Sequence, residues 1–188
     1  MHRRFPWIPV DPSRATAVAT AAMAVAGCTT TPPRFPDDWV GSWRGSLVVP
    51  SASGAPQDVV MELVVARTDD PARHAWTIVY DGPAGRQVRA YELVTRDAAA
   101  GRYAIDEKNG IVLESSHIDG ALYAWFSIAG SNVLVREELV RDAFADDAIS
   151  VEFVTALDRD TKTTGPAGEA RSLVPVSVQR AMLRRQAP

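Results

Sequence analysis

One short stretch of the sequence contains serine, histidine and aspartate, the residue types that catalytic and metal sites use most often. His117 follows Ser115 and Ser116 directly and stands two residues before Asp119. One histidine and one carboxylate are too few for a metal site, although His117 is the candidate if a haem needed an axial ligand. Adjacent strand residues point to opposite faces, so Ser116 and His117 do not form a nucleophile–base pair.

Other catalytic or metal-binding patterns are not found in the sequence. There is no Gly-x-Ser-x-Gly elbow for a serine nucleophile. The acidic pairs at 106–107, 146–147 and 158/160 lack the alternating carboxylates and closing glutamate of a calcium loop. We therefore predict no catalytic residue, no metal, no cofactor and no enzymatic activity.

Aromatic and arginine side chains point instead to a binding cavity. Tyr123 and Trp125 share one face of a predicted strand, and Arg89 and Tyr91 share a face of another. If these faces and that of Arg136 line a lumen, the lumen suits an amphiphile with an apolar body and a carboxylate. If they point outwards, they form cross-strand pairs on the surface. The candidate ligand-contacting residues are Trp43, Arg89, Tyr91, Tyr123, Trp125 and Arg136.

These residues lie on short segments with period-two alternation that turn residues separate. Asn109-Gly110 predicts a type I′ turn, and Asp119-Gly120 predicts another turn. The polar residues 158–172 are predicted as a loop. Alternating valines favour a closing strand over a helix in 173–185. The predicted strands before that loop are a first one after residue 39 and then 58–67, 75–81, 87–96, 101–106, 111–116, 121–128, 132–141 and 149–157.

The start of the first strand resembles that of lipocalin-like β-barrel proteins. The resemblance rests on Gly-x-Trp-x-Gly around Trp43, and it implies that this tryptophan plugs one end of a barrel. Segments 106–111 and 178–184 resemble uncharacterised bacterial envelope proteins with such a barrel, which implies a fold and no activity. We expect an all-β fold, an antiparallel up-and-down meander that closes into a small barrel of about 8–10 strands and so leaves no exposed edge.

The single cysteine, Cys28, follows a leader. Residues 1–14 contain three arginines, and 15–26 are an uncharged run of Ala, Val, Thr and Met. Twelve helical residues span about 18 Å, which is too short for a hydrocarbon core of about 30 Å. A basic region, a short apolar run and small residues before a cut site describe a secretory signal.

The segment Val25-Ala26-Gly27-Cys28 resembles the bacterial lipobox, in which an aliphatic residue and two small residues precede a cysteine. The resemblance implies diacylation of Cys28, cleavage between Gly27 and Cys28, and acylation of the new amino group. Two or three acyl chains anchor a protein stably. Thr29 rather than Asp follows, which by the enterobacterial sorting rule implies the outer membrane. The alternative is an ordinary signal peptide with a chance cysteine near the cut site.

Three parts follow from these observations: a lipoprotein signal peptide at 1–27, the lipidated cysteine with a Pro-rich tether at 28–38, and a β-barrel domain at 39–188. Apolar residues make up 46% of the chain, which suffices for a core. The formal net charge is −3, and residues 1–27 contribute +2, so the remainder carries −5 and a nucleic-acid partner is not expected. One cysteine excludes an internal disulfide.

Two functional hypotheses remain open. In the first, a membrane-anchored envelope lipoprotein binds a small hydrophobic or amphiphilic ligand in its barrel. In the second, the barrel is filled and docks an envelope partner through its outer face or loops. Both place the chain in the cell envelope, lipid-anchored on the periplasmic face of the outer membrane. An open lumen would favour the first hypothesis, and a packed lumen the second.

Overall fold

The structure is a computed structural model that describes residues 33–51, 54–142 and 145–187. The predicted signal peptide at 1–27, the lipobox Val25–Cys28 and residues 28–32 of the predicted tether lie outside the described residues.

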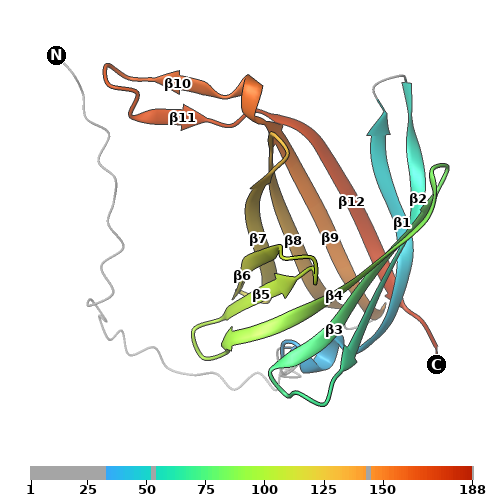
Figure 1. The fold of residues 1–188 in the computed structure, drawn as a ribbon. Coiled ribbons are helices and arrows are strands. Elements are labelled where there is room, and N and C mark those ends of the chain that lie inside the picture. Colours follow the sequence, from blue (N-terminus) through green and yellow to red (C-terminus); the bar gives the residue numbers. More distant parts are fainter. Residues whose placement is uncertain (1–32, 52–53, 143–144, 188) are drawn as a thin grey trace, which may run out of the picture. The chain divides into compact units, whose positions relative to one another are not determined.

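Ten antiparallel strands form a closed barrel in up-and-down order (Figure 1). β1 pairs with β2 on one side and with β12 on the other, which closes the barrel. The predicted all-β meander is confirmed, and the closing strand lies in 173–185 as expected. The barrel strands are β1 (Gly41–Ser51), β2 (Gly54–Arg67), β3 (Arg73–Gly82), β4 (Gly85–Asp97), β5 (Arg102–Asp106), β6 (Val112–Ile118), β7 (Ala121–Ile128), β8 (Ser131–Asp142), β9 (Ala145–Leu157) and β12 (Pro175–Arg185).

Alternation of buried and exposed residues determines which side of each strand faces the barrel interior. On β2, Met61, Leu63 and Val65 are buried, while the residues between them are partly exposed. Leu122 and Ala124 are buried in the same way on β7. None of the helices in the described ranges has the length and apolar character needed to cross a membrane.

Two predicted turns have different outcomes. Asp119 and Gly120 both have positive φ, 50° and 82°, and they connect β6 to β7 as a tight hairpin turn. The loop between β5 and β6 is longer than the two-residue turn predicted at Asn109-Gly110. Asn109 Oδ1 accepts a hydrogen bond from the backbone N–H of Ile111 at 2.9 Å, which stabilises a wider Asx turn.

Residues 158–172, predicted as a loop, contain secondary structure of their own. A short 3-10 turn, η2 (Asp158–Asp160), precedes a separate hairpin of β10 (Lys162–Thr164) and β11 (Ala170–Ser172). Every residue of these two strands is exposed, so no apolar alternation marks them in the sequence. The hairpin projects from the barrel where β9 ends and β12 begins (Figure 1).

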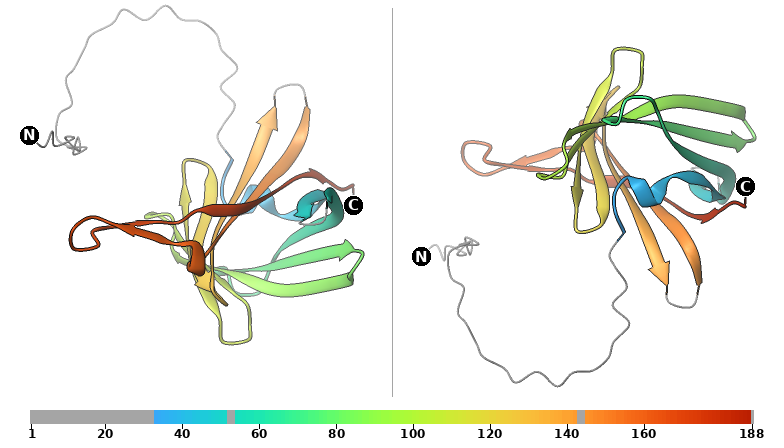
Figure 2. Two further views of the ribbon diagram at one scale, coloured as in Figure 1. Left: turned by 90° about the horizontal axis from the view of Figure 1, so that it is seen from above. Right: turned by 90° about the horizontal axis from the view of Figure 1, so that it is seen from below.

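A 3-10 turn, η1 (Asp37–Trp39), lies across one end of the barrel (Figure 2). Trp39 is fully buried, and its carbonyl oxygen accepts a 2.8 Å hydrogen bond from Trp43 Nε1. Phe35 packs edge-on against Trp39 and stacks on His117, with ring centroids 5.1 Å and 4.4 Å apart. The described end of the predicted tether therefore packs against the barrel instead of extending away from it.

Arg185, the last residue of β12, joins that strand to η1. Its guanidinium lies 4.0 Å from the centroid of the Trp43 ring, at cation–π distance. Nη1 donates a hydrogen bond to Val40 O and Nη2 donates one to Asp38 O, both at 2.8 Å. This end of the barrel is therefore closed by packed aromatic rings, and Arg185 holds η1 to β12.

Candidate ligand-binding cavity

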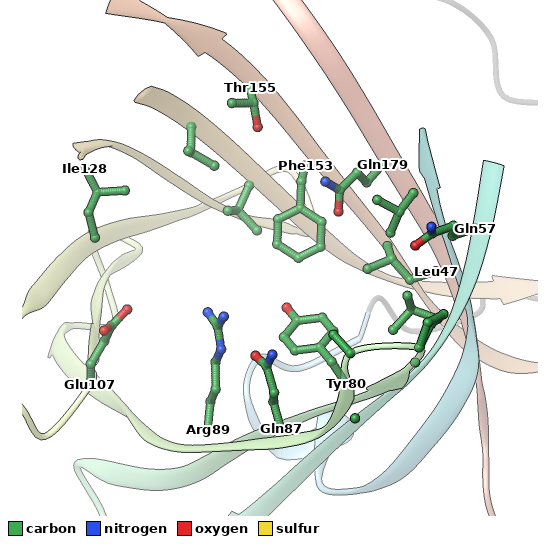
Figure 3. A pocket seen from close by; sticks show the side chains of 18 of the residues that line it. Leu47, Gln57, Tyr80, Gln87, Arg89, Glu107, Ile128, Phe153, Thr155 and Gln179 are labelled. Carbon is green, nitrogen blue, oxygen red and sulfur yellow. The ribbon is translucent and has the colours of Figure 1, made fainter. Parts of the chain in front are cut away.

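The opposite half of the barrel holds an open cavity of about 460 Å³. Its walls include the β3–β4 turn and the ends of β7 and β9 that lie away from η1. In Figure 3, Tyr80 and Arg89 extend into the cavity from one wall, towards Phe153 on the other. The apolar side chains of the lining include Leu47, Val49, Val59, Phe126, Ile128, Val133, Val135 and Phe153.

A few polar groups interrupt this apolar lining. Arg89 is its cation, and the Arg89 guanidinium lies 5.3 Å from the centroid of the Tyr80 ring. Glu107 lines the same cavity, as do Gln57, Gln87 and Gln179. A mainly apolar wall with a small number of placed polar groups is typical of small-molecule sites.

A second cavity of about 100 Å³ adjoins the first on the side of the closed end. The two share part of their lining, including Tyr80, Arg89 and Phe153, so we treat them as an outer and an inner chamber of one lumen. Trp76 and Leu122, which are buried core residues, line the inner chamber only. The inner chamber is thus the deeper of the two.

Glu137 of β8 lies in this inner chamber and is only 5% exposed. Within the described residues, no hydrogen bond or ion pair to its carboxyl group is found. Burial raises the pKa of Glu137 to about 7, because the charged form loses its hydration there. Near neutral pH a large share of molecules therefore carries an uncharged acid, which can donate as well as accept a hydrogen bond.

Two tyrosine hydroxyl groups add further donors to the lumen. Burial raises the pKa of Tyr80 to about 12, against a smaller opposing effect of the Arg89 charge. Burial is also the main cause that raises the pKa of Tyr91, and a hydrogen bond with Arg89 opposes it. Both phenols therefore stay protonated at physiological pH.

The predicted ligand-contacting residues divide into two groups. Arg89 lines both chambers and Tyr91 lines the inner one, so these two meet in the lumen as expected. Trp43 is fully buried at the closed end and lines neither chamber. Its position matches the plug that the lipocalin resemblance implied.

Tyr123, Trp125 and Arg136 lie on the outer face of the barrel, so their predicted place in the lumen is wrong. Trp125 is 68% exposed. Arg136 donates a 3.0 Å hydrogen bond to Tyr123 Oη and pairs with Glu138 at 2.7 Å. Tyr123 and Arg136 form a cross-strand surface pair, and the other face of β7 points into the interior. The residues of that interior face are Leu122, Ala124 and Phe126.

Glu137, Tyr80 and Glu107 also line the lumen, although they were not predicted as ligand-contacting residues from the sequence. A signal for Glu137 was present, because it interrupts an apolar alternation that runs through Val135 and Leu139 on β8. A carboxylate at such a position points to the interior if the alternation is taken strictly. Tyr80 and Glu107 carry no comparable signal.

The serine–histidine stretch takes no part in the lumen beyond Ser115, which lines the inner chamber. His117 lies at the closed end against Phe35, and burial lowers its pKa. Among the described residues, no group of three or more His, Cys, Asp and Glu side chains is arranged to hold a metal ion.

No family model and no curated protein matches this sequence. Among solved structures, the S-type phycobiliprotein lyase CPES from Guillardia theta is similar, with 13% identity, a TM-score of 0.51, and coverage of 79% of this chain and 89% of that chain. Rv2717c from M. tuberculosis has 12% identity and a TM-score of 0.33 over 79% of this chain and 92% of that chain. The lyase comparison supports a lipocalin-like barrel fold.

The prediction that the chain is not an enzyme is overturned by the same comparison. The neighbour is named a lyase, so this fold is not confined to binding or structural proteins. That prediction depended on the lack of a nucleophile–base pair and of a metal cluster in the sequence. Such a lack is no ground for excluding enzymatic activity in this fold.

Proposed function

We propose that the barrel binds a small amphiphilic molecule in the lumen. The observation that carries this proposal is the open cavity of about 460 Å³ with an apolar wall and Arg89 in it. Its volume and lining are those of ordinary small-molecule sites, which range over roughly 300–1,000 Å³. The apolar body of the ligand lies against side chains such as Phe126 and Phe153, and an acidic group meets the Arg89 guanidinium.

The alternative, a filled barrel that only docks a partner, has less support. Side chains fill the end of the lumen next to η1, where Trp39, Trp43 and Trp76 are fully or almost fully buried. They leave the opposite half open. An open lumen favours a ligand over a purely structural core.

We further propose that the chain is a lipoprotein anchored at Cys28 to the periplasmic face of the outer membrane. The support is the match of Val25–Cys28 to the lipobox and the basic and apolar leader before it. An amphiphile-binding barrel held there meets its ligand where amphiphiles concentrate.

Titration of the full-length chain with decanoic acid tests the proposed binding function. Wild type is expected to bind it saturably, and Arg89→Gln to weaken binding by roughly tenfold or more, because a charge-assisted hydrogen bond is lost. Decanol, which has no acidic group, is expected to bind both proteins alike. Isothermal titration calorimetry measures these affinities.

Arg86→Gln is the matched control, since Arg86 lies on the same strand but its side chain is half exposed and faces Glu62 on the outer surface. This variant is expected to bind decanoic acid like wild type. The proposal fails if neither decanoic acid nor decanol binds wild type, or if both arginine variants weaken the acid equally.

A further inference from the structure

The inner chamber holds one carboxyl group that the protein itself leaves without a partner. Glu137 is 5% exposed and lines the chamber, yet no ion pair or hydrogen bond to it is found in the described residues. Buried polar groups are nearly always hydrogen-bonded, and exceptions call for an explanation. Here the exception is a carboxyl group that lines a cavity.

Among the other polar groups of the chamber, Arg89 and Ser115 interact with other residues, whereas Tyr80 feels Glu137 directly: besides burial, the Glu137 charge helps to raise the pKa of Tyr80. Arg89 lies over the Tyr80 ring and acts on the pKa of Tyr80 and Tyr91. Ser115 Oγ donates a hydrogen bond to Leu113 O at 3.2 Å. Burial alone accounts for the pKa shift of Glu137. The carboxyl group thus forms no ion pair with Arg89, the cation that lines the same chamber.

Position and size restrict what can reach Glu137. It lines the inner chamber but not the outer one, whereas Arg89 lines both. A volume of about 100 Å³ is roughly that of three water molecules in the liquid, so the chamber takes a chain end and not a ring system. A ligand whose acid meets Arg89 in the outer chamber therefore presents the buried end of its apolar body to Glu137.

We propose that Glu137 is a second recognition group for the ligand, and that the ligand carries a hydroxyl or amine at the buried end of its apolar body. This inference rests on the proposed binding function and narrows its ligand class. An O–H or N–H donor at that end satisfies the carboxyl group, which a plain alkyl end leaves unpaired. The ligand class is then an apolar chain with an acid at one end and a hydrogen-bond donor at the other.

Three ten-carbon probes that differ only at the far end test this inference: decanoic, 10-hydroxydecanoic and 10-aminodecanoic acid. Calorimetric titration of the full-length chain is expected to show both substituted acids binding about tenfold more tightly than decanoic acid. In Glu137→Leu this preference disappears, while decanoic acid binds within a few-fold of wild type because leucine keeps the volume without an acceptor.

Glu138→Gln is the matched control, because Glu138 is the next residue, lies on the outer face and pairs with Arg136. It is expected to keep the full preference. Glu137→Gln decides the matter if the leucine variant does not fold. The glutamine amide oxygen of this variant still accepts a hydrogen bond from a hydroxyl group, but it has no negative charge to attract a protonated amine. Only the preference for 10-aminodecanoic acid is therefore expected to be lost.

Three results overturn the inference, and they differ in which proposal they leave unaffected. If decanoic acid binds and Arg89→Gln weakens it, but wild type shows no preference among the three acids, only the role of Glu137 falls. If none of the three acids binds wild type, the proposed binding function falls with it. A preference that both Glu137 variants retain unchanged also overturns the assignment.

Discussion

At the scale of single residues, Glu137 makes the stability of the barrel depend on pH in a defined direction. Its pKa is about 7 in the folded chain, against 4.5 for an ordinary glutamate. Below pH 4.5 both states carry the proton and burial of the group has little cost. Between 4.5 and 7 the unfolded state ionises first, so stability falls as pH rises, and the loss is complete above 7 at roughly 3 kcal/mol.

We therefore predict that Glu137→Gln, which cannot ionise, stabilises the barrel more at pH 8 than at pH 4.5. Urea unfolding at a series of pH values gives the difference in unfolding free energy between variant and wild type. That difference is expected to grow from pH 4.5 to 7 and then level off. Glu138→Gln on the outer face serves as the reference, and a Glu137→Gln difference that does not change with pH would contradict the prediction.

In the candidate site, the sequence predicts which residues share a strand face, but it does not predict which face points into the barrel. Alternation indicates that Tyr123 and Trp125 share one face and Phe126 lies on the other, but large residues on both faces leave the inner face undecided. The same alternation correctly predicts that Arg89 and Tyr91 share a face of their strand. The alternation of β8 could have placed Glu137 in the interior, but its lack of a partner depends on neighbours from other strands, which no local pattern contains.

At the scale of secondary-structure elements, Arg185 connects three of them. From the end of β12 it contacts the Trp43 ring of β1 and donates to two backbone carbonyls at η1. We predict that Arg185→Ala lowers the unfolding free energy by about 2 kcal/mol, through loss of these hydrogen bonds and of the cation–π contact. Denaturant unfolding followed by tryptophan fluorescence measures the change.

Two further variants make the prediction about Arg185 specific. Lysine keeps the charge but lacks the forked geometry for two carbonyls, so Arg185→Lys is expected to restore only part of the stability. Arg180→Ala on the same strand removes an exposed ion pair with Glu152 and is expected to change stability by less than about 0.5 kcal/mol. Equal losses in Arg180→Ala and Arg185→Ala would show that no special fastening exists at this end.

Strands were predictable wherever apolar and polar residues alternate, and a glycine can mark a position where two strands come close together. The barrel strands alternate strongly, and Gly45 is required because a Cβ there would collide with the Met182 carbonyl on β12. The β10–β11 hairpin was missed, since its exposed residues make only local pairs and bury nothing. Phe35 was assigned to the tether because nothing nearby in sequence shows that the ring packs on His117.

At the scale of the whole molecule, the two ends of the barrel differ in how they are packed. The η1 end is packed with aromatic rings, and the other end holds the lumen with Arg89. A fixed end gives the strands a rigid base from which the lumen side chains project. Variants in the lumen such as Arg89→Gln can therefore change binding without opening the closed end.

The proposed lipid anchor, by contrast, depends on residues that precede the barrel, and we predict that Cys28→Ser separates anchoring from folding. Serine has no thiol for diacylation, so the variant is expected in the soluble fraction or as the unprocessed chain, without the added acyl mass. Thr29→Ser keeps the lipobox and is expected to behave as wild type. Cell fractionation with intact-mass measurement distinguishes these outcomes.

The affinity for decanoic acid shows whether the Cys28→Ser variant still folds. The lumen is built from residues that begin at Leu47 in the chain, well after the cysteine. Decanoic acid is therefore expected to bind the released variant and wild type with equal affinity, because lost acylation leaves the cavity intact. Unchanged membrane association and unchanged mass in Cys28→Ser would rule out the lipoprotein assignment while leaving the binding proposal in place.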